Sequence, residues 1–215
     1  MCGRYAIYAE EDIIQMREII NEVNKRYSEK PENNQNMTVV KTGEIYPTDN
    51  APVIISNNNI DNQDNIVVPM KWGFPKWDNK GVIFNARGES IREKPMFSKA
   101  LETRRCILPA NGFFEWSHDG AKKAKQKYWL SLKKPEVMFM AGLYGVFLDK
   151  DNEKYNAFVI LTCPANSCVS EIHDRMPIII PKDQNNLWLK DLEAAKEIYM
   201  DWGRNTDLLK GSVSK

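Results

Sequence analysis

The stretch MCGRY places Cys2 one residue from the amino end, where a cysteine has chemistry that an internal cysteine lacks. If Met1 is removed, Cys2 becomes the terminal residue and carries a free α-amine beside its thiol. Reference pKa values of about 7.7–8.0 for the amine and about 8.5 for the thiol leave both groups partly reactive near neutral pH. An aldehyde would form a Schiff base with the amine, and the thiol would then add to the imine carbon and close a five-membered thiazolidine ring.

The position of Cys2 also fits two other roles. The residue could be a small apolar side chain that packs under the first strand. It could instead be a terminal nucleophile that attacks acyl groups with its own amine as the base, as in amidohydrolases and self-processing enzymes. Residue position alone does not separate these three interpretations.

Two further side chains are of a type that transfers protons. Glu115 lies in the aromatic run NGFFEW, where burial would raise the pKa of its carboxyl and suit it to general acid or base catalysis. Strand alternation could equally point this carboxyl to solvent. His173 precedes an apolar strand in EIHDRMP, which favours a proton donor over a plain loop hydrogen bond, whereas His118 in SHDG is typical of a solvated turn.

The segment FNARGES places Asn85 and Arg87 two residues apart, on one face if the chain is extended. The amide could orient a reacting group, and the guanidinium could hold a phosphate. A turn into a following helix, capped by Ser90, would explain the same residues without any chemistry.

The segment MKWGFPKW combines cations with aromatic rings, the mixture that single-stranded nucleic acid uses for phosphates and bases. A half-buried β-edge with snorkelling lysines is the alternative interpretation. The residues concerned are Lys71, Trp72, Phe74, Lys76 and Trp77.

The composition limits the partners and the compartment. Lys and Arg number 30 and Asp and Glu 29, so the formal charge of +1 gives no overall attraction for nucleic acid or membrane, and any anion site must be a local patch. Four cysteines without zinc-knuckle spacing or disulfide-scaffold density lead us to expect a reducing cytoplasm, no metal and no cofactor. The longest apolar run, 137–148, is shorter than the roughly 20 residues that span a bilayer, so we expect no membrane segment, and nothing indicates an oligomer.

Helical periodicity is confined to a few segments. We expect an amphipathic helix with an acidic first turn over residues 10–30 and a second helix over residues 91–105. Short helices near residues 182–189 and 192–202 should close the chain. The tail from about residue 203 should be partly loose.

Strand-like runs dominate from residue 66 onward. We expect the run 137–148 to form a strand pair or a long bent strand, in which Gly142 and Gly145 permit bending or close packing. Strands interrupted by few helices predict a single α+β domain over residues 1–215, with a largely antiparallel, barrel-like β core and peripheral helices.

Six motifs occur in order along nearly the whole chain: MCGRY, WGFPKW, NARGES, RRCILPANGFFEW, AGLYG and IHDRMP. As an ordered set they resemble the SRAP family (SOS response-associated peptidase), abasic-site processing proteins that bind single-stranded DNA and join covalently to its damaged sites. The resemblance covers roughly residues 2–190. It implies an enzyme of the DNA damage response that forms a thiazolidine between the mature terminal Cys2 and the ring-opened aldehyde of an abasic sugar, which shields the site from strand cleavage.

The resemblance also implies roles for the other candidate residues in catalysis. By similarity, Asn85 helps to orient Cys2 and the sugar. Glu115 acts in proton transfer during imine formation and ring closure. His173 lines the same pocket and assists formation or reversal of the link.

A second group of residues would bind DNA, by the same similarity. Arg4 and Arg87 match positions that hold the phosphates flanking the lesion. Trp72 and neighbouring apolar residues, among them Phe74, resemble the wedge that stacks against bases and bends the strand, and Lys71 would add positive charge beside it.

Two small departures from the family pattern leave every proposed reacting group in place. The chain has NARGES where the family commonly reads NARAET, and FFEW where it commonly reads FYEW. Gly88 could loosen the turn, and Phe114 lacks a hydroxyl that a tyrosine would supply near the pocket. Two other functions stay open: an N-terminal-nucleophile cysteine peptidase or amidohydrolase, and a non-covalent single-stranded DNA-binding module for which Cys2 is dispensable.

Overall fold

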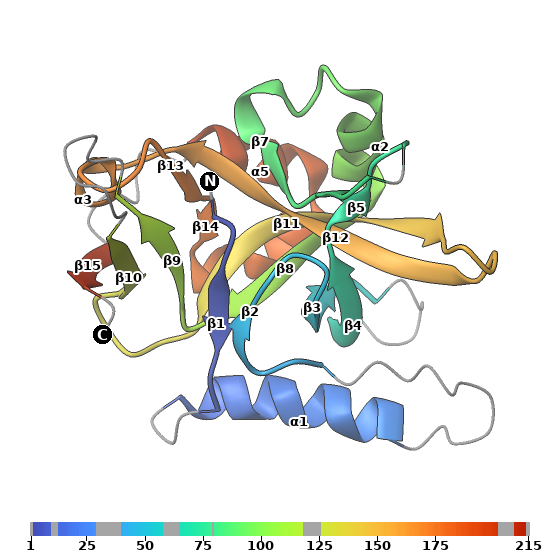
Figure 1. Ribbon diagram of the computed structural model, residues 1–215, viewed down its shortest axis with the longest axis horizontal. Coiled ribbons are helices and arrows are strands. Elements are labelled where there is room, and N and C mark those ends of the chain that lie inside the picture. Colours follow the sequence, from blue (N-terminus) through green and yellow to red (C-terminus); the bar gives the residue numbers. More distant parts are fainter. Residues whose placement is uncertain are drawn as a thin grey trace.

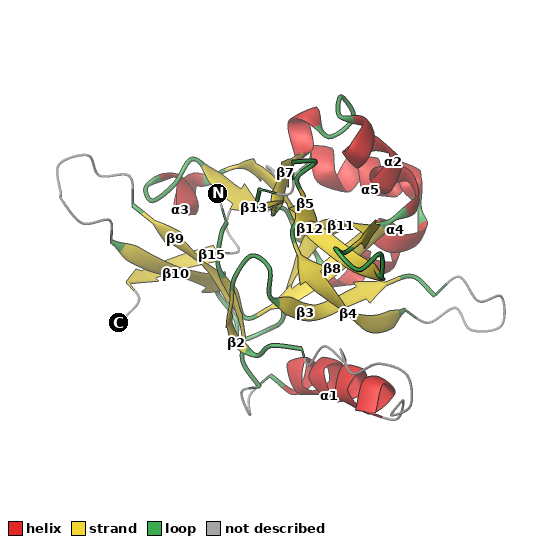
Figure 2. Cartoon of the chain, turned by 45° about the vertical axis from the view of Figure 1, so that its right-hand side comes forward, coloured by secondary structure: helices red, strands yellow, loops and turns green. Residues whose placement is uncertain are grey.

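The computed structural model describes residues 2–9, 13–28, 40–57, 65–78, 80–117, 126–201 and 209–213. Helices occupy the periphery of this part of the chain (Figures 1 and 2). The helices and 3-10 turns are α1 (Ile14–Ser28), η1 (Gly88–Ser90), α2 (Pro95–Thr103), α3 (Ser167–Ser170), η2 (Lys182–Gln184), α4 (Asn185–Lys190) and α5 (Leu192–Met200).

The strands form three sheets. The first has the order β15-β10-β9-β1-β2, the second has the order β13-β12-β4-β3-β8-β11-β14 with β7 added beside β12, and the third pairs β5 with β6. Their bounds are β1 (Tyr5–Ile7), β2 (Gly43–Ile45), β3 (Asn50–Ile55), β4 (Ile66–Trp72), β5 (Phe74–Pro75), β6 (Val82–Ile83), β7 (Asn85–Arg87), β8 (Arg105–Ala110), β9 (Gly112–Trp116), β10 (Lys127–Leu132), β11 (Met138–Leu148), β12 (Lys154–Pro164), β13 (Arg175–Pro177), β14 (Ile179–Ile180) and β15 (Leu209–Val213).

Five strands of the second sheet close into a barrel. β12 pairs with β4, β4 with β3, β3 with β8, β8 with β11, and β11 again with β12. Among the described strands, only the β12–β4 and β12–β7 pairings are parallel. The prediction of an α+β fold with a largely antiparallel, barrel-like core and peripheral helices is therefore confirmed.

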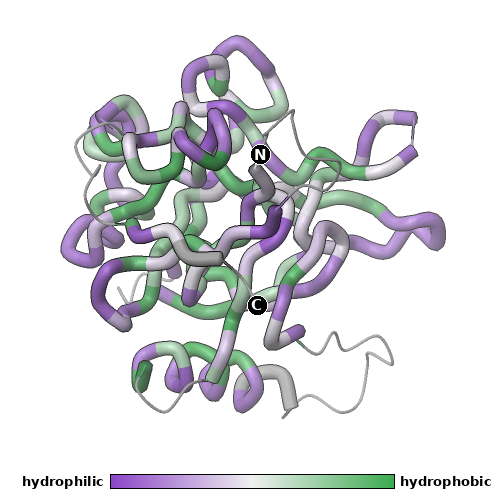
Figure 3. Tube along the Cα trace, turned by 60° about the vertical axis from the view of Figure 1, so that its left-hand side comes forward, coloured by the Kyte–Doolittle hydropathy of each residue, from purple (hydrophilic) through white to green (hydrophobic). Residues whose placement is uncertain are grey.

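The apolar run 137–148 forms one long strand, β11, rather than a strand pair. Gly142 lies opposite Cys106 on β8 and Ile160 on β12. A Cβ atom at Gly142 would lie 2.3 Å from Leu108 Cδ2, so close packing in the barrel requires glycine there. Figure 3 shows that apolar segments gather in the interior, while hydrophilic segments follow the loops and outer edges.

Several boundaries differ from those predicted. α2 begins at Pro95 instead of residue 91, because proline favours the first turn of a helix and has no N–H to donate within it. α1 begins at Ile14, and the acidic residues expected in its first turn lie outside the described residues. Residues 209–213 were expected in a loose tail but form β15, which pairs with β10 and buries Leu209. Residues 202–208 and 214–215 lie outside the description.

β1 carries the amino end to the centre of the molecule. It lies between β9 and β2 in the first sheet. The start of the chain lies near β13 in both Figure 1 and Figure 2. This arrangement brings the two sheets together around Cys2.

Candidate functional site

Cys2 lies three residues before the start of β1 and is buried, with none of its surface exposed. Its thiol donates to the backbone carbonyl of Arg4 across 3.8 Å. β1 and β9 pair in antiparallel fashion, with Tyr5 opposite Phe113. Continued in the same register, this pairing places residues 2–4 beside residues 114–116. The antiparallel pairing therefore brings Cys2 and Glu115 into one region.

Asn85 reaches Cys2 from the second sheet. Its strand, β7, pairs in parallel with β12, and Asn85 lies opposite Ile160. The side-chain Nδ2 donates to the carbonyl oxygen of Cys2 at 2.8 Å. The amide oxygen Oδ1 is buried and accepts no hydrogen bond from the described residues, so it remains available to a ligand or a terminal amine.

Glu115 and His173 face each other in the same region. Glu115 is 2% exposed and His173 is 8% exposed, and Glu115 Oε2 lies 3.9 Å from His173 Nε2. The backbone N–H of Arg175 donates to His173 Nδ1 at 2.9 Å, which leaves Nε2 as the nitrogen that carries the proton in a neutral ring. In a protonated ring, Nδ1 would donate instead to Asp174 Oδ1, also at 2.9 Å.

Burial changes the acid–base properties of this region. It raises the pKa of Glu115 from its ordinary value to about 7. It also raises the pKa of the Cys2 thiol far above its ordinary value, and the negative charge of Glu115 adds to that rise. A carboxyl with a pKa near 7 can both donate and accept a proton at neutral pH, whereas the thiol stays protonated until a base takes its proton.

The alternatives for the four candidate catalytic residues can now be compared with the geometry. Cys2 is buried, as a packing role requires. Its carbonyl also accepts a hydrogen bond from Asn85, and the negative charge of Glu115 raises the pKa of its thiol. Glu115 points inward rather than to solvent. Cys2, Asn85, Glu115 and His173 are brought together from four separate stretches of the sequence; Met1 and His118 lie outside the described residues.

An ion pair between a buried arginine and an exposed glutamate beside this region had no clear sequence signal. Arg175 is 7% exposed and binds Glu89 with both terminal nitrogens; Nη2 lies 2.8 Å from Glu89 Oε2. The same Nη2 donates to the carbonyl of Thr162 at 2.8 Å. Only the position of Arg175 two residues after His173 could have drawn attention to it. Its network fixes β13 against η1 and β12, and so holds the segment that carries His173.

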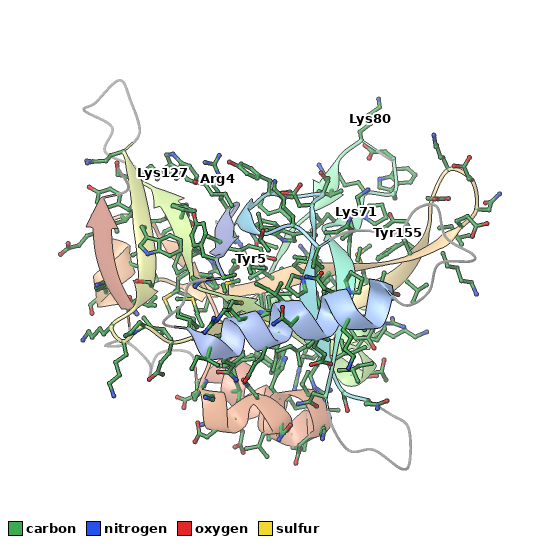
Figure 4. The ribbon with its side chains drawn as sticks, turned by 90° about the horizontal axis from the view of Figure 1, so that it is seen from below. Arg4, Tyr5, Lys71, Lys80, Lys127 and Tyr155 are labelled. Carbon is green, nitrogen blue, oxygen red and sulfur yellow. The ribbon has the colours of Figure 1, made fainter. Side chains whose placement is uncertain are left out.

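The candidate phosphate-binding side chains lie on different elements. Arg87, at the end of β7, is exposed, while Arg4 is about one-quarter exposed and paired with Glu44. Lys71 on β4 lies with its ammonium 5.7 Å from the centre of the Tyr155 ring. Figure 4 shows Lys71 and Tyr155 apart from Arg4, on the other half of the molecule.

Trp72 and Phe74 correct the expectation of a base-stacking wedge, because they are 0% and 1% exposed. The Trp72 indole N–H donates to the Phe84 carbonyl at 2.9 Å, and its ring meets Tyr5 edge-to-face at 5.1 Å. Trp72 thus supports the segments that carry Cys2 and Asn85, rather than a ligand. Trp77, in the same motif, is 96% exposed and is available for stacking.

Neither a metal centre nor a membrane helix is visible in the described ranges. No cluster of three or more His, Cys, Asp or Glu side chains in this part of the chain could hold a metal ion. None of the described helices is long and apolar enough to cross a membrane. All four cysteines are free thiols.

Comparison with known proteins identifies relatives along nearly the whole chain. The family model of the SOS response associated peptidase (SRAP) matches residues 1–208. The abasic site processing protein YoaM of Bacillus subtilis is 32% identical over 195 residues, which cover 88% of this chain and 79% of YoaM. The abasic site processing protein YedK of Escherichia coli is 30% identical over 130 residues, 60% of this chain and 57% of YedK. A crystal structure of a Bacteroides thetaiotaomicron protein, 27% identical, superposes with a TM-score of 0.75 and covers 100% of this chain and 92% of that one.

Proposed function

Because the chain belongs to the SOS response associated peptidase (SRAP) family, we propose that it processes abasic sites in single-stranded DNA by forming a covalent link to them. The relatives named as abasic site processing proteins support the substrate class. The observation that carries the proposal is the convergence of Asn85, Glu115 and His173 on a cysteine one residue from the amino end.

The proposed reaction begins after removal of Met1. The α-amine of Cys2 attacks the aldehyde carbon of the ring-opened abasic sugar and forms a carbinolamine. This intermediate loses water to give an imine, and the Cys2 sulfur then adds to the imine carbon while the thiol proton passes to the nitrogen. The product is a thiazolidine, and one water molecule is released for each link formed. No oxidant or reductant is needed.

The buried groups fit the proton transfers in this sequence. Departure of water requires a proton donor, and attack by sulfur requires a base that accepts the thiol proton. Glu115, with its pKa raised to about 7, suits both steps in turn. His173 Nε2, 3.9 Å from the carboxyl, can exchange a proton with it after a small approach. Asn85 fixes the Cys2 carbonyl and offers a free amide oxygen to the new amine.

The DNA strand would contact the charged and aromatic side chains that remain accessible. Arg4 and Arg87 would bind phosphates beside the lesion, and Lys71 would contact the backbone farther along. Base stacking would fall to Trp77, which is exposed, rather than to the buried Trp72 and Phe74.

A crosslinking assay tests the proposed function. The native chain is incubated with an oligonucleotide that contains one abasic site, denatured, and run on a gel beside Cys2→Ala, Cys2→Ser and a variant with one alanine inserted between Met1 and Cys2. We expect a heat-reversible crosslinked band with the native chain alone.

Each other outcome favours a different function. Absence of a crosslink with the native chain would reject the proposal. Binding of single-stranded DNA without a crosslink would favour a non-covalent binding module. Cleavage of unrelated peptides, lost in Cys2→Ala, would favour an N-terminal-nucleophile peptidase or amidohydrolase.

A further inference from the structure

Glu44 and the three side chains that donate to it form a compact charged group, here called the Glu44 cluster: Arg4, Glu44, Tyr46 and Lys127. Arg4 Nη1 donates to Glu44 Oε2 at 3.0 Å, and the Tyr46 hydroxyl donates to the same oxygen at 2.9 Å. Lys127 Nζ donates to the other carboxylate oxygen, Oε1, at 2.7 Å. One carboxylate therefore holds two cations from separate parts of the chain: Arg4 directly precedes β1, and Lys127 begins β10.

Neither cation depends on Glu44 alone for its position. The Arg4 guanidinium lies 4.3 Å from the centre of the Tyr46 ring and 4.9 Å from the centre of the Trp116 ring. The Lys127 ammonium lies 3.8 Å from the centre of the Phe114 ring. Aromatic faces attract cations and restrict their motion. The aromatic rings already restrict the two cations, so the distinct contribution of Glu44 is its negative charge.

The cluster is accessible to a nucleic acid backbone. The exposed fractions of the Arg4, Glu44 and Lys127 side chains are 26%, 29% and 25%. Figure 4 shows Arg4 and Lys127 next to each other on the same edge of the molecule. The hydrogen bond from Lys127 lowers the pKa of Glu44 below its ordinary value, so this carboxylate is ionised throughout the neutral range. The negative charge of Glu44 offsets one of the two positive charges of Arg4, which is two residues from Cys2, and Lys127.

We propose that Glu44 is a specificity-determining residue that limits the attraction of Arg4 and Lys127 for the phosphodiester backbone of undamaged single-stranded DNA. This inference rests on the proposed function. The backbone of an undamaged strand carries the same charge as that of a damaged strand, so cations near the reacting residue raise the affinity for both. Glu44 partly neutralises the two cations and so weakens the binding of both kinds of strand. The choice between damaged and undamaged DNA then depends more on the reaction with the aldehyde, which only the damaged strand carries.

The test measures binding of an undamaged single-stranded oligonucleotide by fluorescence anisotropy over a series of salt concentrations. Glu44→Gln keeps the size of the side chain and removes its charge. We expect this variant to bind roughly three- to tenfold more tightly at low salt, and its plot of log K against log salt to be steeper by about 0.7, the value for one added contact with a single strand. When undamaged competitor is present in excess, the fraction of damaged DNA that becomes crosslinked should be lower for this variant than for the native chain.

Three further variants separate charge from structure. Glu44→Asp keeps the charge and should retain the salt slope of the native chain. The double variant Glu44→Gln with Lys127→Gln restores the charge balance and should return the slope toward the native value. Glu193→Gln removes one carboxylate from α5, outside the cluster, and serves as the matched control for net charge; it should leave the slope unchanged.

The failures of the inference and of the proposed function can be told apart. If the native chain binds single-stranded DNA and Glu44→Gln binds no more tightly, or binds more weakly, the inference is rejected and the proposed function stands. An equal tightening by Glu193→Gln would also reject it, because the effect would then belong to net charge. If the native chain does not bind single-stranded DNA at all, both are rejected.

Discussion

The site around Cys2 and the Glu44 cluster both include a residue of the segment 2–4, Cys2 in the first and Arg4 in the second, yet they differ in burial and in charge. Glu115 and His173, in the site around Cys2, are less than one-tenth exposed, whereas the ion-paired side chains of the Glu44 cluster are about one-quarter exposed. Burial raises the pKa of Glu115 to about 7. The ion pairs of the cluster lie near the surface, where a single ion pair contributes little to the stability of the fold. From this difference we expect the site around Cys2 to control the rate of the proposed reaction, and the Glu44 cluster to control the affinity for DNA and its salt dependence.

The largest effect that distinguishes the two regions is expected at Glu115. Glu115→Gln keeps the shape of the side chain but cannot take a proton from the thiol, so the crosslinking rate at saturating DNA should fall by about 10²- to 10⁴-fold. The measurement is a single-turnover time course resolved on denaturing gels. A rate within about fivefold of the native rate would assign the proton transfer to another group.

The pH dependence of the same rate should show the raised pKa of Glu115. Its carboxylate form, the base that takes the thiol proton, predominates only above pH about 7, so the rise of the rate with pH should become less steep near that value and end only when the α-amine is also deprotonated. His173 and Asp174 are the titratable groups nearest to this carboxyl, and the α-amine of Cys2 titrates at a higher pH. The break near pH 7 should be missing in Glu115→Gln, and a native profile without that break would contradict the assignment.

A smaller effect is expected at Asn85, which makes one hydrogen bond to Cys2. Asn85→Ala removes the donor to the Cys2 carbonyl, and a bond of this kind contributes about 1 kcal/mol, or about fivefold in rate. The rate should fall while the affinity for undamaged DNA changes by less than a factor of about two. A change in affinity with an unchanged rate would instead assign Asn85 to DNA binding and not to the positioning of Cys2.

The smallest effect is expected at the exposed Arg87. Arg87→Ala should weaken DNA binding by a few-fold and lower the salt slope by about 0.7, with no effect on the rate at saturating DNA. Anisotropy titrations at several salt concentrations measure both quantities. An unchanged slope would show that Arg87 makes no phosphate contact.

The fold class and the identity of the candidate reacting residues could be predicted from the sequence, because both depend on local pattern. Alternating strands gave the α+β class, and residue type with position identified Cys2, Asn85, Glu115 and His173 as candidates. Which side chains contact one another in the folded chain could not be predicted from local pattern. In the single motif WGFPKW, Trp72 is buried against Tyr5 while Trp77 is exposed, and only the packing of β4 against β1 distinguishes them. The pairing of Arg175 with Glu89, and of both Arg4 and Lys127 with Glu44, likewise joins residues that are far apart in sequence.

The central claim is that Cys2 reacts as a terminal aminothiol, and intact-protein mass spectrometry after incubation with an abasic oligonucleotide tests it most directly. We predict a protein that lacks Met1 and an adduct whose mass is the sum of protein and oligonucleotide minus one water. The adduct should map to Cys2, and its thiol should no longer react with iodoacetamide, whereas a simple Schiff base would leave that thiol free. An adduct on an internal lysine, or one formed equally well by a chain that retains Met1, would contradict the claim.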